Sequence, residues 1–495
     1  MNAIFSAVLR HAVDSPAKPA LVDRGGSLTY RRLAQEVTRL ALRLRTIQPR
    51  ALGILADNGA AWVLADLAAN VAGIAVIPIP QFFSSAQVDH LVRTAAIDYV
   101  LTDRPESLAG HDTVSTSAFA YGLRLVRLAC PSVANRLPAG TTKVSFTSGT
   151  TGAPKGVCLG CRQIETVASS LREASGALPS DRHLCLLPLA TLLENIAGVY
   201  TPLLAGATIC LPPLEEVGLM GSSGLDVVRM IQALDSWQAS SAIMVPQMLE
   251  MAVAAGRAGV RMPARLRFLA VGGATVSPHL LGLAAELGLP VHQGYGLSEC
   301  ASVVAVNGAG ANRPGSVGKL LPHVEIAFGP DQEILVRNAS WKGYLGDAGG
   351  QLTDGYLATG DLGWLDADGY LYLRGRKKNM FVTSFGRNVS PEWVEGELTA
   401  EPIILQAAVF GEARPSGCAV VFAQPTTGAA DIDDAVAAAN RRLPDYARVG
   451  KWIRTPAPFS VDNGLATANG RLHRTAIHKT YAEELGPTTL SLSPT

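Results

Sequence analysis

Residues 145–156 combine hydroxyl side chains, glycines and one lysine in the way that a polyphosphate site requires. The string reads Ser-Phe-Thr-Ser-Gly-Thr-Thr-Gly-Ala-Pro-Lys-Gly. Its apolar lead-in, 144–146, predicts a strand, and the small residues after it let backbone N–H groups surround an anion. The phosphate-binding candidates are Thr147, Ser148, Gly149, Thr150, Thr151, Gly152 and Lys155. A Ser/Thr/Gly-rich hairpin has a similar composition, but this order of residues favours the anion site.

The same string differs from the Walker phosphate loop. That loop places Gly-Lys-Ser/Thr after a four-residue spacer, whereas the spacer after Gly149 ends in Pro154-Lys155-Gly156. We therefore expect a second type of nucleotide-binding loop.

Further motifs follow the phosphate-binding string along the chain. They are Gly-Tyr-Gly-Leu-Ser-Glu at 294–299, Thr-Gly-Asp at 359–361, Arg-Gly-Arg-Lys-Lys at 374–378 followed by Ser-Phe-Gly-Arg at 384–387, and Asn-Gly-Arg at 469–471. This ordered series resembles the adenylate-forming (AMP-binding) superfamily, in particular its acyl-CoA synthetases of the long-chain fatty acid–CoA ligase type. The matches extend from Ser145 to Arg471 and cover most of the chain.

The resemblance implies an ATP-dependent acid–thiol ligase. A carboxylate oxygen attacks the α-phosphorus of ATP, pyrophosphate leaves, and the acyl group passes from acyl-AMP to a thiol, which we expect to be CoA. Negative charge accumulates on phosphate oxygens, so the protein must supply positive charge and positioning. The residues expected to do this are Lys155, Glu299 and Arg471. Because Mg²⁺ prefers oxygen ligands, Glu299 with Thr147 is the expected magnesium site.

The resemblance also assigns the adenosine-binding residues. Tyr295 would offer its aromatic face to adenine, Asp361 would accept both ribose hydroxyls, and Arg376 would assist at the same sugar. The full expected set is Gly273, Ala274, Gly294, Tyr295, Gly296, Ser298, Asp361 and Arg376. Ser298 replaces the threonine that the family usually has and keeps the hydroxyl. From the residues alone, Asp361 also fits a turn and Arg376 a solvated charge.

Arg471 departs from the family pattern. The family has a lysine here, on its mobile C-terminal domain, to bridge the α-phosphate and the carboxylate during adenylation. Arginine keeps the charge but is planar and bulkier, so the exchange bears on the adenylation rate. In the family, the second half-reaction follows a rotation of the small domain. Here the hinge would be Lys378, and the loop brought to the site would be 384–388.

Length and patterning indicate two or more cooperating units. A chain of 495 residues is too long for one ordinary core. Strand-like apolar runs such as 203–211 and 266–272 alternate with helix-like stretches such as 30–45, which predicts a layered α/β fold. The resemblance implies a large, multi-layered α/β domain at 1–377 and a smaller, mobile α+β domain at 378–495.

Composition argues against several classes of partner. The net charge is +1, from 42 basic and 41 acidic residues, so no global field recruits nucleic acid or an acidic membrane. The first ten residues lack the pattern of a secretory signal. The most apolar region, 63–80, contains Asp66, Asn70 and Gly73 and predicts a helix that leads into a buried strand, not a membrane span. We expect a cytoplasmic protein without an integral membrane segment.

The substrate is expected to be a fatty or related carboxylic acid without an α-amine. Amino-acid-activating relatives place an aspartate at the position that aligns with Leu193, and 188–198 resembles the long-chain acyl-CoA synthetases more closely. A one-residue shift would instead place Glu194 in the pocket. Two alternatives stay open: an enzyme that loads an acyl or peptidyl carrier protein, and a weakly catalytic nucleotide-binding homologue, for which Arg471 is the argument.

Overall fold

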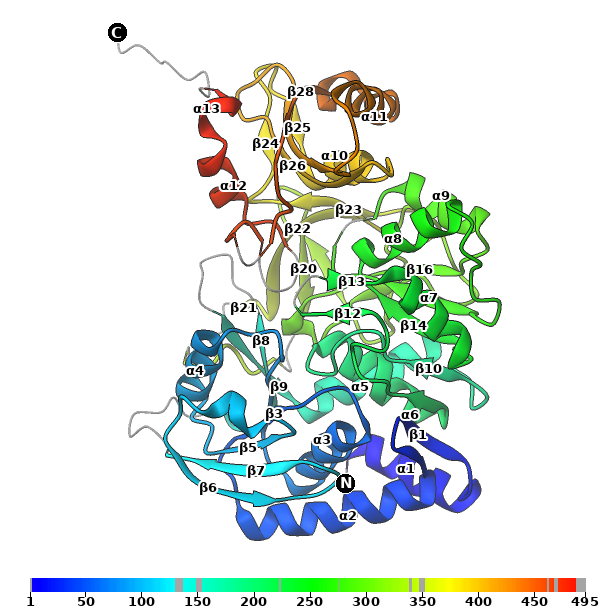
Figure 1. Ribbon diagram of the computed structural model, residues 1–495, viewed down its shortest axis with the longest axis vertical. Coiled ribbons are helices and arrows are strands. Elements are labelled where there is room, and N and C mark those ends of the chain that lie inside the picture. The colour runs from blue at the N-terminus through cyan, green and yellow to red at the C-terminus, as the bar shows by residue number, and fades with distance from the viewer. Residues whose placement is uncertain are drawn as a thin grey trace.

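The computed structural model describes residues 2–129, 137–147, 154–221, 224–274, 276–337, 341–346, 352–460, 463–466 and 471–486. The phosphate-loop candidates Ser148 to Gly152 therefore lie outside the described residues. Figure 1 shows a large N-terminal domain with a smaller C-terminal domain above it. Both combine helices with strands, so the expected α/β architecture of a large and a small domain is confirmed.

A seven-stranded sheet leads to the phosphate loop. Its strands, in spatial order, are β6 (Thr113–Ala118), β7 (Arg124–Leu128), β5 (Tyr99–Thr102), β3 (Leu52–Leu55), β4 (Val76–Pro78), β8 (Thr141–Thr147) and β9 (Lys155–Gly160). The neighbours β5, β3, β4 and β8 run parallel, and β9 returns antiparallel to β8. Its accompanying helices are α2 (Tyr30–Ile47), α3 (Ala60–Ala72) and α4 (Ser85–Thr94). The sheet therefore presents Thr147 and Lys155 on either side of the loop.

A nine-stranded sheet carries the motifs for adenosine. In order, its strands are β18 (Lys319–Leu320), β17 (Ala305–Val306), β16 (Val291–Tyr295), β15 (Phe268–Val271), β14 (Ser241–Met244), β10 (Arg182–Leu184), β11 (Thr208–Cys210), β1 (Pro19–Asp23) and β2 (Gly26–Thr29). The central strands from β16 to β1 are parallel. Ligands of such sheets bind at the carboxyl ends of the strands, where β16 presents Tyr295.

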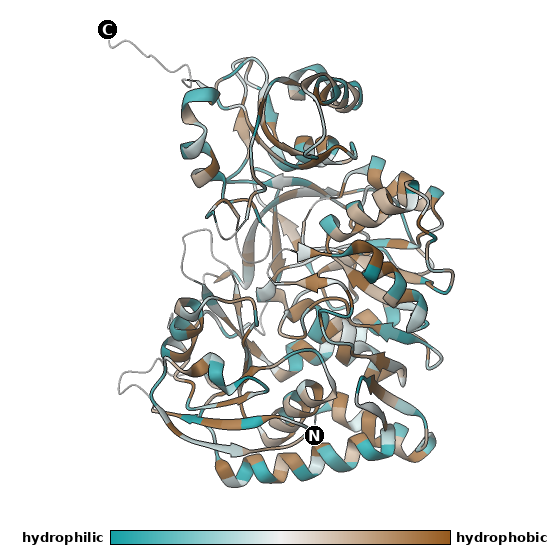
Figure 2. Cartoon of the chain, viewed as in Figure 1, coloured by the Kyte–Doolittle hydropathy of each residue, from teal (hydrophilic) through white to brown (hydrophobic). Residues whose placement is uncertain are grey.

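Helices of the large domain pack against these sheets and bury apolar faces. Figure 2 shows polar and apolar residues alternating along α2, and Leu33, Val37, Leu40 and Leu44 are its buried stripe. The others are α1 (Ala3–Asp14), α5 (Cys161–Ala174), the π-helix η2 (Glu194–Tyr200), α6 (Thr201–Ala205), α7 (Val227–Ser236), α8 (Pro246–Arg257) and α9 (Pro278–Glu286). Among the described residues, we find no helix whose length and apolarity would let it cross a membrane.

A five-stranded sheet lies between the two larger bodies in Figure 1. It contains β19 (Ile326–Phe328), β20 (Glu333–Arg337), β21 (Leu352–Thr353), β22 (Tyr356–Leu365) and β23 (Leu371–Arg376). The small domain follows with β24 (Phe381–Val382), β25 (Asn388–Val389), α10 (Pro391–Thr399), β26 (Ile404–Phe410), β27 (Gly417–Ala423), α11 (Ala429–Arg442), β28 (Val449–Arg454), α12 (Arg474–Thr480) and α13 (Ala482–Leu485). Its core packs α10 and α11 against the β26–β27–β28 sheet.

Most expected elements are present, with one error. The helix at 30–45 and the strand within 266–272 are confirmed as α2 and β15. The strand expected over 203–211 is wrong in its first half, where Leu203 to Ala205 end α6 and only Thr208–Cys210 is a strand. Gly206, with φ of 75°, ends that helix. A short buried apolar run fits a helix end and a strand equally well, so its pattern does not separate them.

Candidate active site

Asp361 lies at the centre of a buried polar group. The Tyr295 hydroxyl donates a hydrogen bond of 2.7 Å to its Oδ2, and Arg376 Nε lies 2.8 Å from its Oδ1. Arg376 also donates to the Thr359 carbonyl oxygen at 3.0 Å. Burial raises the pKa of Asp361, whereas the positive charge of Arg376 and the hydrogen bond from Tyr295 lower it. The group offers a fixed carboxylate to hydrogen-bond donors such as hydroxyls.

Strand pairing brings these residues together. Asp361 and Arg376 face each other across the antiparallel β22–β23 pair. The backbone N–H of Asp361 is tied to Thr359 Oγ1 at 3.1 Å, and Gly360 between them has φ of 72°, which favours glycine. Sequence reasoning therefore placed Asp361, Tyr295 and Arg376 in one neighbourhood, and the structure does the same.

The glycines beside Tyr295 line a narrow space between strand ends. A Cβ at Gly296 would overlap the Ser302 carbonyl oxygen, so no larger residue fits there. A Cβ at Gly272 would lie 3.4 Å from the Gly294 carbonyl oxygen, which places the ends of β15 and β16 side by side. Gly273 has φ of 96°. Gly273 and the adjoining Ala274, both expected to bind adenosine, thus follow β15 next to the strand that carries Tyr295, the expected adenine partner.

Tyr344 connects the two expected phosphate and metal residues. Its hydroxyl donates a hydrogen bond of 2.7 Å to Glu299 Oε1. The Lys155 ammonium lies 5.5 Å from the centroid of its ring. The Glu299 backbone carbonyl also accepts from Gln163 Nε2 at 2.8 Å. Glu299 and Lys155 therefore both lie close to one aromatic side chain, Glu299 at its hydroxyl and Lys155 near its ring.

Sequence reasoning missed Tyr344. Residues 341–346 run against β9, with Leu345 N donating to the Gly156 carbonyl oxygen at 2.7 Å and Cys158 N to Gly343 at 3.0 Å. This pairing positions Tyr344 beside β9, whose first residue is Lys155. The contact joins segments far apart in the chain, and no motif expected from the resemblance includes this tyrosine.

The remaining expected residues of this region lie beside them. Thr147 ends β8 opposite Lys155, and its hydroxyl lies 3.5 Å from the Lys155 carbonyl oxygen. Ser298 precedes Glu299 in a short 3₁₀-helix, Ser298–Cys300. The backbone thus delivers a hydroxyl, an ammonium and a carboxylate to one end of the site.

Arg471 brings a charge from the small domain to this site. Desolvation and repulsion from Arg376 lower the pKa of Arg471, whereas attraction to Asp361 and Glu299 raises it. Arg471 in turn favours the ionised form of Asp361. The positive charge of Arg471 therefore lies within electrostatic range of both expected nucleotide carboxylates. Lys378, the expected hinge, has its pKa lowered by burial and then by Arg376 and Arg471.

A second contact between the domains involves Glu250 of α8. Its Oε1 accepts a hydrogen bond of 3.0 Å from the Thr399 hydroxyl of α10. Burial raises the pKa of Glu250 to about 7, and the bond from Thr399 acts in the opposite direction. The observed arrangement of the domains thus holds a carboxyl group against the small domain.

The acid beside Leu193 is already fully engaged. Glu194 is completely buried, with Oε1 3.1 Å from His183 Nε2 and Oε2 accepting from Leu187 N at 3.2 Å. His183 Nδ1 lies 3.0 Å from Ser241 Oγ. Cys185 joins His183 and Glu194 in a compact buried cluster. The two nitrogens of His183 and the two carboxylate oxygens of Glu194 therefore all have protein partners. Glu194 is not free to bind a substrate amine.

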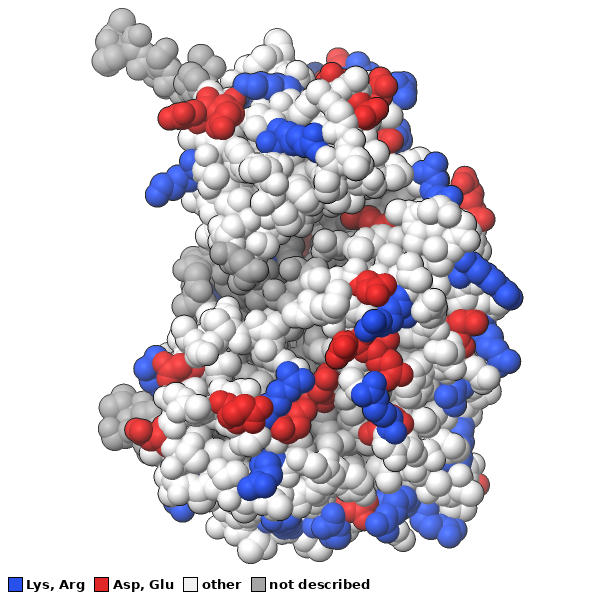
Figure 3. Space-filling model, viewed as in Figure 1, with Lys and Arg blue, Asp and Glu red and all other residues white. Residues whose placement is uncertain are grey.

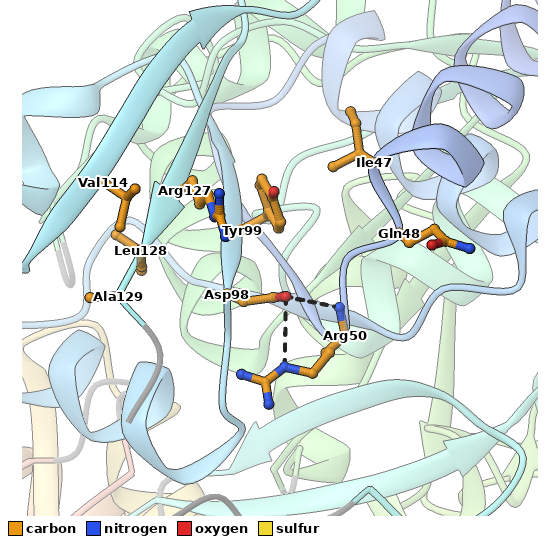
Figure 4. A pocket seen from close by; sticks show the side chains of 9 residues that line it. All are labelled: Ile47, Gln48, Arg50, Asp98, Tyr99, Val114, Arg127, Leu128 and Ala129. Atoms are coloured by element: carbon orange, nitrogen blue, oxygen red, sulfur yellow. Dashed lines mark hydrogen bonds and ion pairs between the residues drawn. The ribbon is translucent and has the colours of Figure 1, made fainter. Parts of the chain in front are cut away.

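A hollow of about 340 Å³ elsewhere is separate from this site. Figure 4 shows Asp98 facing Arg50 inside it, with their ion pair at 3.8 Å. It is lined by Ile47, Gln48, Arg50, Asp98, Tyr99, Val114, Arg127, Leu128 and Ala129. None of the expected site residues lines it. Figure 3 shows a different hollow, between the two domains. Positive and negative side chains are mixed over this face of the molecule.

Comparison with known proteins agrees with this geometry. Residues 8–357 match the model of the AMP-binding enzymes, and residues 378–487 match the AMP-binding enzyme C-terminal domain. The chain belongs to the AMP-binding enzyme family. The resemblance inferred from its motifs is thereby confirmed.

Similar proteins include several named CoA ligases. The long-chain-fatty-acid–CoA ligase FadD15 of Mycobacterium bovis is 26% identical, over 86% of this chain and 85% of that protein. The feruloyl-CoA synthase of an Amycolatopsis species is 30% identical, over 88% of this chain and 92% of that protein. Among solved structures, the anthranilate CoA ligase AuaEII in complex with anthranoyl-AMP has a TM-score of 0.81 at 20% identity, covering 97% of both chains. At 20% identity, the similarity to AuaEII shows a shared fold and nothing about the substrate of this chain.

Proposed function

We propose that the protein is an ATP-dependent acid–thiol ligase that converts a carboxylic acid to acyl-AMP and then to its CoA thioester. The observation that carries this proposal is the buried group of Asp361, Tyr295 and Arg376, which holds a carboxylate ready to accept hydrogen bonds from ribose hydroxyls. Asp361 provides a ribose acceptor, and Glu299 provides a carboxylate beside the phosphate loop. Membership of the AMP-binding enzyme family and the CoA ligases among the relatives support the same activity.

The proposed adenylation uses charge and position more than covalent chemistry. The substrate carboxylate attacks the α-phosphorus, and Arg471 stabilises the charge that the two groups share. Lys155 holds the departing pyrophosphate, together with the loop 148–152. Asp361 and Tyr295 fix the adenosine end, so that the α-phosphorus meets the carboxylate in one orientation.

The donor set beside the phosphate loop fits a hard cation. Glu299 offers carboxylate oxygens and Thr147 a hydroxyl, which are ligands that Mg²⁺ prefers. When bound there, Mg²⁺ would neutralise charge on the β and γ phosphates. The hydrogen bond from the Tyr344 hydroxyl to Glu299 Oε1 orients that carboxylate.

The substrate class that we propose is a fatty or related carboxylic acid without an α-amine. The carboxylate of Glu194 is occupied by His183 and Leu187, and Leu193 offers no charge. Acids of this class match those in the names of the relatives, a long-chain fatty acid and ferulate. We also keep the predicted cytoplasmic location as part of this proposal.

The test is pyrophosphate release with ATP, Mg²⁺ and a panel of fatty, aromatic and amino acids. We expect release with one or more amine-free acids and a further acceleration by CoA. Release that depends on amino acids would contradict the substrate class, and no release with any acid would favour the weakly catalytic alternative. Transfer to a phosphopantetheinylated carrier protein but not to CoA would favour the carrier-loading alternative.

A further inference from the structure

Glu194 and Asn195, adjacent residues of the π-helix η2, form hydrogen bonds with residues of two different sheets. Glu194 is bonded to His183 of β10, which in turn contacts Ser241 of β14, so its side chain is fixed to the nine-stranded sheet. Asn195 points into a separate buried group at the seven-stranded sheet. The tight fit extends to Gly198, where a Cβ would overlap Glu194 Oε1 and lie 2.8 Å from His183 Nε2.

The second buried group has Lys143 of β8 at its centre. The Lys143 ammonium donates to Asp66 Oδ1 at 2.8 Å, to the Tyr200 hydroxyl at 2.9 Å and to Asn195 Oδ1. Asp66 Oδ2 accepts from Tyr200 at 2.5 Å and from Asn195 Nδ2 at 3.2 Å. The three N–H groups of the ammonium therefore have three acceptors, supplied by α3 and η2.

These four side chains are almost completely removed from water. Lys143, Asp66 and Asn195 are 1% exposed and Tyr200 is 0% exposed. Burial lowers the pKa of Lys143, and the attraction of Asp66 opposes that shift. The desolvation of a buried ion pair offsets much of its attraction, so such a pair adds little net stability. Its effect is to define one arrangement of β8, α3 and η2, because any other leaves a buried charge unpaired.

That arrangement matters because the nucleotide site is divided between the two sheets. β8 ends at Thr147, where the phosphate loop begins, and belongs to the seven-stranded sheet. β16 ends at Tyr295, beside Asp361, and belongs to the nine-stranded sheet. One nucleotide can contact both ends only if the sheets keep a fixed separation.

We propose that Glu194 and Asn195, with Lys143, Asp66 and Tyr200, form a clamp that sets the Thr147 end of β8 against the adenosine site. This inference rests on the proposed function, since it concerns how ATP is held. The five are positioning residues: they contact each other and the sheets. The clamp selects for a ligand that spans both sheets, which ATP does through its β and γ phosphates and AMP does not.

The test compares the affinities for ATP and AMP in variants of the clamp. Lys143→Met combined with Asp66→Asn removes both charges together, and Tyr200→Phe removes one hydroxyl with little change in shape. Relative to wild type, we expect the preference for ATP over AMP to fall about tenfold in the double variant and about threefold in Tyr200→Phe, with AMP affinity unchanged within about twofold. Circular dichroism and thermal unfolding establish that each variant is folded.

A matched control is available in the ion pair of Arg267 with Asp181, whose Nε–Oδ1 distance is 2.7 Å. This pair flanks β10 and β15 within the nine-stranded sheet, so Arg267→Met should lower the unfolding temperature without changing the ratio of ATP to AMP affinity. An unchanged ratio in a folded Tyr200→Phe, or a fall in the double variant no larger than in Arg267→Met, would overturn the clamp. Failure of the wild type itself to bind ATP would instead contradict the proposed function.

Discussion

The hydroxyl of Tyr344 donates a hydrogen bond of 2.7 Å to Glu299, although 45 residues separate them. The ring of the same tyrosine lies 5.5 Å from the Lys155 ammonium. Tyr344 thus contacts the carboxylate that we assign to the metal and lies near the ammonium that we assign to the leaving pyrophosphate. Its position makes the orientation of Glu299 dependent on a residue outside the recognised motifs.

Tyr344→Phe should weaken the metal site while keeping the ring beneath Lys155. A hydrogen bond to a charged group contributes about 1.5 to 3 kcal/mol, so we expect roughly a tenfold or greater loss of adenylation rate at low Mg²⁺. Saturating Mg²⁺ should restore part of that rate. A magnesium titration of pyrophosphate release measures both quantities. An unchanged magnesium dependence would separate Tyr344 from the metal site.

Lys155→Ala and Glu299→Ala should each remove most adenylation and leave the fold intact, because both side chains serve phosphate charge and not the core. The expected loss is about 2 to 4 kcal/mol of transition-state stabilisation. Lys342→Ala is the matched control, since Lys342 is an exposed lysine of the neighbouring segment. Near-wild-type pyrophosphate release by either variant would show that its site assignment is wrong.

Arg471 should act in the first half-reaction and the loop 384–388 mainly in the second. Arg471→Ala should slow formation of acyl-AMP by roughly 100-fold but spare thioester formation from supplied acyl-AMP. Lys378→Pro fixes a backbone torsion at the proposed hinge and should do the reverse. Arg471→Lys should maintain or raise the adenylation rate if arginine is a tolerated substitute.

Single-turnover measurements of each half-reaction separate these effects. Equal damage to both half-reactions by Arg471→Ala would contradict alternation of the domains for this residue. Arg471 would then be a structural charge at the domain interface.

Glu250 should make the contact between the domains depend on pH. Burial raises the pKa of Glu250 to about 7, and Thr399 of the small domain lies against its carboxyl group. We therefore expect the docked arrangement to bind the proton more strongly than an undocked one. Docking is therefore favoured at low pH and weakens as the pH rises from about 4.5 through 7, where Glu250 ionises in the contact. The ratio of the adenylation rate of Glu250→Gln to that of wild type should increase over this range.

Thr399→Val provides the control for this prediction. The Thr399 hydroxyl favours the ionised form of Glu250, so its loss should steepen the decline of the adenylation rate with rising pH. A constant ratio of Glu250→Gln to wild-type rates across the range would show that docking of the small domain is independent of this carboxyl.

The sequence predicted those parts of the site that lie on strand ends or in tight turns. Tyr295, Asp361 and Arg376 belong to recognisable strings, and strand pairing brings them together. Tyr344 could not be found in this way because its contact depends on how residues 341–346 pack against β9. The strand expected over 203–211 was wrong because an apolar run carries no information about where α6 ends.

Buried charges were also poorly visible in the sequence. In the sequence, Asp66 argues against a membrane span but does not reveal its partner. Lys143 lies four residues before Thr147 and belongs to none of the motifs. Their pairing becomes meaningful once α3, β8 and η2 are packed together. The sequence left open whether Glu194 enters the substrate pocket, and only the fold shows that His183 and Leu187 bind its carboxylate.

The most direct test of the central claim is the fate of carboxylate oxygen during one complete reaction. A substrate acid labelled with ¹⁸O at both carboxylate oxygens is incubated with ATP, Mg²⁺ and CoA, and the AMP is analysed by mass spectrometry. Attack of the carboxylate on the α-phosphorus, followed by thiolysis, transfers one labelled oxygen to AMP. We expect AMP carrying a single ¹⁸O together with unlabelled pyrophosphate. Unlabelled AMP, or label in inorganic phosphate formed with ADP, would contradict the acyl-adenylate mechanism.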